Sequence, residues 1–250
     1  MLNKQQGTFL KLSCSLFYHT REQSMDITEN NGNLTATTTN VQTNAKHKRI
    51  PRVLQNQILL ALSHYPELEN TSIRFVFTRK LKSSIMAARP VVKTLLGLRN
   101  KRVYEILISP NFKLKHSILP IHQVEDSVLI GWIGHELGHI MDYEQRSTLG
   151  VARFGLLYWL SKRYIRKAER VADTFAVNRG MAPYILATKD FILGHAELPQ
   201  KYKDKIARLY LSPDDIVELV AKLEDRKEVR DQIIKEETEI VEEIIAEKST

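Results

Sequence analysis

Cysteine is nearly absent from this sequence of 250 residues, where Cys14 is the single example. A lone cysteine excludes a disulfide within the chain and a cysteine-rich metal site. Long apolar runs are also lacking, since no stretch reaches the roughly 20 apolar residues of a membrane-spanning helix. The apolar patch at 12–18 contains two serines and is followed by no small-residue cleavage pattern, so we expect no signal peptide. These absences predict a cytoplasmic protein.

Hydrophobic residues make up 43% of the chain and charged residues 26%, which is typical of a soluble globular protein. Large apolar side chains are scarce in 28–46, so this stretch cannot bury enough surface to offset its chain entropy. We therefore expect a disordered leader at 1–48, a folded domain at 49–211 and a charged helical tail at 212–250.

The net charge of +8 is unevenly distributed, because 13 acidic and only 6 basic residues stand from Ser212 onward. An acidic tail on a basic body results. A basic body suits nucleic acid, an anionic membrane surface or no specific partner. No helix-turn-helix, ribonucleoprotein or zinc-finger pattern is present, so we do not expect nucleic acid. The basic stretch at 79–102 is either a solvated face or a contact for an anionic partner.

Apolar spacing predicts a small sheet beside several helices. A helix should open at Pro51 and end before Pro66, and alternating apolar residues predict strands at 72–78 and 103–109. Ser212, followed by proline and two aspartates, should begin the tail helix. Its apolar stripes either pack on the domain, fray in solvent, or contact a partner or a second copy. The expected fold class is α+β, mostly helical.

The stretch 128–143 reads V-L-I-G-W-I-G-H-E-L-G-H-I-M-D-Y and places His135 and His139 four residues apart. On a helix, both imidazoles would face the same side and could reach one ion. The spacing indicates a single zinc ion, and Glu136 would accept a proton from water in the H-E-x-x-H arrangement. The alternative is a chance pattern on a helix that meets no metal.

Three glycines, Gly131, Gly134 and Gly138, lie in this same stretch. Glycine inside a helix costs about 1 kcal/mol relative to alanine. Because their spacing leaves small surface on one side, we expect another backbone to pack closely there.

A third metal ligand is indicated by E-R-V-A-D, residues 169–173. Glu169 and Asp173 would share a helical face, and the small Ala172 and Ala176 would let this helix approach the histidine helix. Glu169 could then reach the metal, while Asp173 could hold a ligand imidazole. The alternative for two acids at this spacing is a solvated face.

H-E-L-G-H followed by E-R-V-A-D resembles the gluzincin metallopeptidases of the HtpX and CAAX-prenyl-protease type. The resemblance implies a zincin-like domain with an active-site helix, zinc ligands His135, His139 and Glu169, the catalytic base Glu136 and the structural carboxylate Asp173. It covers only about 128–180. Many members have membrane-spanning helices around these motifs, whereas the 29 residues between His139 and Glu169 could not cross a bilayer. The chain thus resembles a soluble or peripheral version.

The group that would stabilise the oxyanion is less well marked. Members of the family often carry a downstream His-Pro, and the nearest histidine here is His195. Tyr143 and Tyr184 are further candidates. The resemblance also implies that a substrate peptide lies along an edge strand, which either predicted strand would supply.

Residues Leu149 to Lys167 combine apolar and aromatic side chains with a basic cluster. The segment is either a core helix or a peripheral contact with a membrane interface. For the whole chain, the sequence predicts a zinc metalloendopeptidase that acts on peptides or proteins. The alternative is a non-catalytic, zinc-stabilised interaction module, which would have no need of Glu136.

Overall fold

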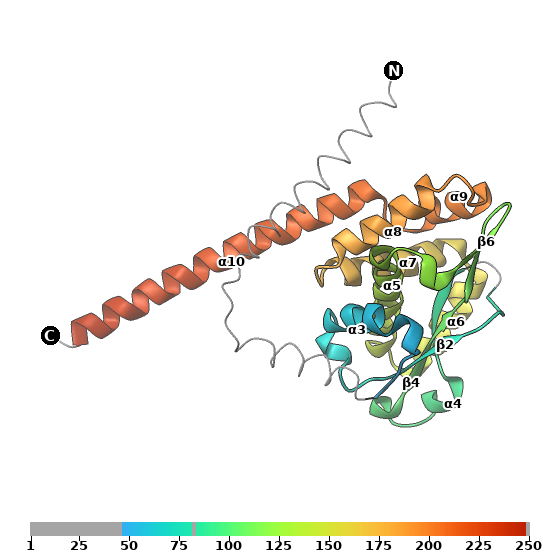
Figure 1. Ribbon diagram of the computed structural model, residues 1–250. Coiled ribbons are helices and arrows are strands. Elements are labelled where there is room, and N and C mark those ends of the chain that lie inside the picture. The colour runs from blue at the N-terminus through green and yellow to red at the C-terminus, as the bar shows by residue number, and fades with distance from the viewer. Residues whose placement is uncertain (1–46, 82–83, 249–250) are drawn as a thin grey trace, which may run out of the picture.

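The computed structural model describes residues 47–81 and 84–248 (Figure 1). All of the expected leader except its last two residues therefore lies outside the described part. Lys48, one of these two, already belongs to the folded domain, because its Nζ donates to three carbonyl oxygens between Leu68 and Thr71. The fold is α+β, with many helices beside a small mixed sheet.

The main sheet has four strands in the order β1-β2-β4-β3. Strands β1, β2 and β4 are parallel, and β3 runs antiparallel to β4. The strands of this sheet and of the separate β5–β6 hairpin are β1 Lys48–Arg49, β2 Ser72–Phe77, β3 Met86–Pro90, β4 Val103–Ile108, β5 Asn111–Lys113 and β6 Ile118–Pro120.

Both predicted strands are confirmed, as β2 and β4. Alternation explains them: Ile73 and Phe75 are buried while Arg74 is exposed. The expectation that either strand would offer an edge is wrong, because β2 lies between β1 and β4, and β4 lies between β2 and β3. Strand β3, which the sequence did not reveal, forms the edge beside β4.

Helix α5, Asp126–Glu144, is the centre of the domain and contacts α3, α7, α8 and β3 (Figure 1). Every residue of this helix from Val128 to Tyr143 is buried. The remaining helices are α3 Gln55–Ser63, α4 Val92–Leu95, α6 Thr148–Leu160, α7 Lys162–Val177, α8 Ala182–Gly194, α9 Gln200–Leu209 and α10 Pro213–Lys248, with short 3-10 turns at Arg52–Leu54, Pro66–Leu68, Arg99–Lys101 and Ile121–Gln123.

The glycines of α5 allow two neighbouring helices to approach closely. A Cβ atom built on Gly138 would lie 2.4 Å from the carbonyl oxygen of Ala172 in α7. One built on Gly131 would lie 2.2 Å from the carbonyl oxygen of Tyr184 in α8. Both distances are shorter than any tolerable contact, so the expected close backbone packing is confirmed.

The segment from Leu149 to Lys167 is not one element, because the chain breaks at Ser161 between α6 and α7. Val151 and Phe154 of α6 are buried, whereas Trp159 and several leucines are exposed. The prediction of a core helix is therefore confirmed for only one face of α6. Among the helices of the described ranges, none is both long and apolar enough to cross a membrane.

Helix α10 begins at Pro213, directly after Ser212, as predicted. The Asp215 amide donates to Oγ of Ser212, and the Ser212 amide donates to Oδ2 of Asp215, which completes a reciprocal cap. Ile216 is fully buried, and Figure 1 shows the helix continuing far beyond the domain. The first turns of the expected tail thus pack on the domain.

Candidate metal centre

His135, His139 and Glu169 come together between α5 and α7, and one ligand atom from each lies within 4.8 Å of the others. Oε2 of Glu169 is 3.1 Å from Nε2 of His135 and 3.4 Å from Nε2 of His139. The close contact of Gly138 with Ala172 explains the approach, because His135 and Glu169 each lie one turn before those residues. All three side chains are buried.

Asp173 holds the other nitrogen of His135. Its Oδ1 is 2.7 Å from Nδ1 of that histidine, while Oδ2 accepts hydrogen bonds from Nζ of Lys189 and the Leu211 amide. Burial alone would raise the pKa of Asp173, but the positive charges of Lys189 and His135 lower it to about 2. Asp173 is therefore a fixed carboxylate that orients the His135 ring.

The protein supplies strong negative charge around the two histidines. Burial by itself would lower the pKa of His135, but Asp173 and Glu169 raise it to about 10. Burial opposes ionisation of Glu169 as well, yet His139 and His135 hold its pKa well below the usual range. The Tyr158 hydroxyl donates to Oε1 of Glu169, so Oε2 remains directed at the imidazoles.

These residues suit a metal ion on chemical grounds. Two imidazoles and a carboxylate form a donor set that divalent transition metals bind. A cavity of about 30 Å³ lies against His135 and Glu136, which is room for about one water molecule. Nδ1 of His139 is buried and has no hydrogen-bond partner among the described residues. The His-His-Glu group could therefore hold a metal, with His139 less firmly oriented than His135.

Glu136 lies at the same cavity and is tied to the edge strand. Its Oε2 accepts a 2.6 Å hydrogen bond from the backbone amide of Ala88 in β3. Burial raises its pKa, which the positive charges of His135 and His139 partly offset. A carboxylate with a raised pKa is suited to accepting a proton.

The three candidate oxyanion donors lie in different places. Tyr143 is beside the cluster, with its ring stacked on His139 and its hydroxyl 3.4 Å from the Ala88 carbonyl oxygen. The ring of Tyr184 packs against His64, and His195 packs against Phe191. Of the three, only Tyr143 has a ring contact with a residue of the cluster among the described residues, so the structure brings only Tyr143 to the site.

Other side chains of the site were not predicted. Tyr158 contacts Glu169, while Tyr202 and Tyr210 line the cavity. Lys189 lies over the Tyr210 ring at 4.3 Å. Of these residues, Lys189 alone left a signal in the sequence, as a single cation on the buried face that Ile185 and Ile192 share. The tyrosines come from separate helices, and no spacing rule connects them.

No protein-family model matches the chain, and neither a curated protein nor a solved structure does.

Proposed function

We propose that this protein is a zinc-dependent metalloendopeptidase with a zincin-like domain. The observation that carries the proposal is the position of Glu136, which lies within electrostatic reach of the buried His135, His139 and Glu169 and shares a water-sized cavity with His135. Two histidines and a carboxylate are a donor set of catalytic zinc sites, which keep one position open. A structural site would have no use for an adjacent base with a raised pKa.

The catalytic roles follow from the positions of these side chains. Zinc, when bound, polarises the scissile carbonyl and acidifies water. Glu136 accepts the proton of the attacking water and passes it to the leaving amine. Asp173 keeps Nδ1 of His135 protonated, so that Nε2 is free as a ligand. Tyr158 orients Glu169 in a similar way. Its hydroxyl donates to Oε1, which leaves Oε2 free as a ligand.

A peptide substrate would bind along the edge of strand β3. The N–H and C=O of Ala88 are directed at Glu136 and Tyr143 rather than at β4, so they belong to the open edge. A peptide that adds to this edge would take over the Ala88 amide. Oε2 of Glu136 would then be released toward the scissile bond, and Tyr143 would stand close enough to donate to the oxyanion.

The proposal is tested by comparing the native chain with Glu136→Gln. Each protein is loaded with zinc, its metal content is measured, and cleavage of a broad peptide library is followed by mass spectrometry. We expect equal zinc in both and cleavage by the native chain alone. Glu224→Gln, an exposed change on α10, is the matched control and should cleave normally.

The other outcomes are equally informative. Zinc in both proteins with no cleavage by either would favour the non-catalytic interaction module. Cleavage that persists in Glu136→Gln would remove Glu136 from the role of base.

A further inference from the structure

One face of α6 is apolar and exposed. Leu149, Arg153, Leu156 and Leu160 follow one another at spacings of four, three and four residues and therefore share a side of the helix. Leu149 is 81% exposed, and Trp159, which directly precedes Leu160, is 80% exposed. A large tryptophan in water is costly to leave uncovered, and a contiguous apolar patch marks an interaction site.

A second exposed apolar group lies at the start of α6. Val92, Leu96 and Leu98, in and after α4, are all largely exposed, and Leu96 reaches 90%. Oγ1 of Thr148, the residue before Leu149, donates to the carbonyl oxygen of Leu95 at 3.0 Å. Leu96 directly follows the acceptor residue of this hydrogen bond, and Leu149 directly follows the donor residue. The two exposed apolar groups therefore adjoin each other. We call the exposed side chains of residues 92–101 and 149–167 the α4–α6 surface.

The charge of this surface has one sign. Neither 85–104 nor 145–168 contains an acidic residue. Lys93, Arg99 and Lys101 are exposed around α4, and Arg153 is exposed on α6. Ser161 alone separates Leu160 from Lys162, so the basic start of α7 adjoins the apolar end of α6.

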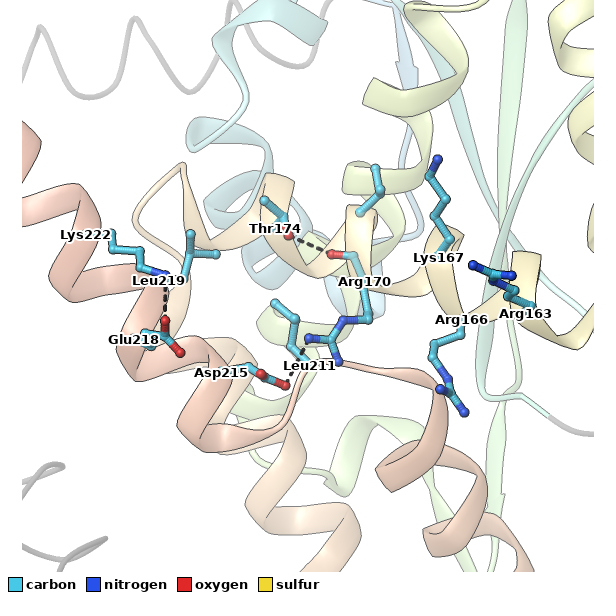
Figure 2. Close-up of a pocket in the computed structure, with 11 residues that line it drawn as sticks. Arg163, Arg166, Lys167, Arg170, Thr174, Leu211, Asp215, Glu218, Leu219 and Lys222 are labelled. Atoms are coloured by element: carbon cyan, nitrogen blue, oxygen red, sulfur yellow. Dashed lines mark hydrogen bonds and ion pairs between the residues drawn. The ribbon is translucent and has the colours of Figure 1, made fainter.

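The basic side chains at the start of α7 are available to a ligand. Figure 2 shows the pocket that α7 and α10 line, where Arg170 is directed at Asp215 and Arg163, Arg166 and Lys167 extend further along α7. The nearby acid Glu218 is paired with Lys222. Among the described residues, Arg163, Arg166 and Lys167 have no ion-pair partner, so their charge is not neutralised within the domain.

We propose that the α4–α6 surface docks on an anionic lipid bilayer. Exposed leucines and a tryptophan suit the boundary between headgroups and acyl chains, and flanking lysines and arginines suit anionic headgroups. A second copy of the chain is a poorer occupant, because a symmetric dimer would set two positive surfaces against each other. The surface spans at least the length of α6 from Leu149 to Leu160, about 16 Å.

This docking is independent of the proposed peptidase activity, although the surface and the metal cluster share structural elements. Helix α6 carries both Trp159 and Tyr158, and the latter donates to Glu169. Strand β3, which contacts Glu136, leads directly into α4. Because docking does not require the catalytic base, the Glu136→Gln variant should bind vesicles as the native chain does.

The test is flotation of the full chain with vesicles of phosphatidylcholine, with and without phosphatidylglycerol. We expect the native chain to float only with the anionic vesicles and less at high salt. Leu96→Ser/Trp159→Ser should weaken binding more than about tenfold, and so should Lys162→Glu/Arg163→Glu. The matched controls are Ile118→Ser/Ile234→Ser and Lys201→Glu/Arg208→Glu, exposed changes elsewhere, which should bind normally.

Fluorescence of the native chain gives a second readout, for which the conservative Trp159→Phe variant is the reference. The chain has two tryptophans, and Trp132 is buried, so a vesicle-induced blue shift of the native chain should be absent in Trp159→Phe. Failure to bind anionic vesicles would overturn the proposal, as would equal losses in the control variants. Self-association that disappears in Leu96→Ser/Trp159→Ser, without vesicle binding, would assign the surface to a second copy instead.

Discussion

The backbone amide of Ala88 donates a 2.6 Å hydrogen bond to Oε2 of Glu136. This contact joins the edge strand β3 to the helix that carries both histidines. It also means that the proposed catalytic base has a stability role, because its oxygen satisfies a buried N–H group.

Substitutions of Glu136 should separate the two roles. Gln retains an oxygen that can accept from Ala88, whereas Ala leaves the amide unpaired, which costs about 1–3 kcal/mol. We therefore expect Glu136→Ala to be less stable than Glu136→Gln in chemical denaturation. Both should lower cleavage by about 10²–10⁴-fold. Equal stability of the two variants would mean that the Ala88 contact contributes nothing.

The contact of Gly138 with Ala172 should control the assembly of the metal cluster. Gly138→Ala would place a Cβ 2.4 Å from a backbone oxygen, so α7 must move and carry Glu169 away from the histidines. We expect a loss of about 1–3 kcal/mol in stability and weaker zinc binding. Gly155→Ala, where the added Cβ meets nothing within 4 Å, should instead stabilise α6 slightly. Normal zinc affinity in Gly138→Ala would contradict this account.

Asp173 should matter for metal affinity although it does not face the metal position. Asp173→Asn removes the charge that fixes the His135 ring, and loss of such a partner lowers metal affinity about 10–100-fold. Competition with a chromogenic chelator would measure the change. Asp225→Asn, an exposed substitution on α10, is the control. Unchanged affinity in Asp173→Asn would show that its contact with Nδ1 does not orient the ligand.

Zinc binding should release a proton from His135. In the metal-free protein the pKa of His135 is raised to about 10 from an ordinary 6.5, so the protonated ring stabilises the fold below pH 6.5, and this contribution is lost as pH rises through 10. Zinc needs the neutral ring. Its apparent affinity should therefore rise about tenfold per unit between about pH 7 and about pH 9. Calorimetry in buffers of different ionisation enthalpy would count the protons, and a pH-independent affinity would contradict the prediction.

The sequence predicted the parts of the site that lie within one helix or obey helical spacing. The spacing of His135 and His139 was sufficient to predict that both face the same side of one helix. The small Ala172 correctly indicated how closely α7 packs on that helix. Strand β3 could not be recognised, because M-A-A-R-P has neither alternation nor β-branched residues and is held by pairing with β4.

The misplaced oxyanion candidates have a related cause. Tyr184 and His195 have side chains that can donate to an oxyanion, but their positions depend on how α8 packs. Lys189 on the same helix faces the cluster and Tyr184 faces His64. Only tertiary packing distinguishes these directions.

Metal content is the most direct test of the central claim that His135, His139 and Glu169 form one zinc site. The native chain, stripped with a chelator and reloaded with zinc, should retain one ion per chain by elemental analysis after desalting. His139→Ala and Glu169→Gln should retain none, and Glu224→Gln should retain one. No zinc in the native chain, or equal zinc in all four proteins, would contradict the account.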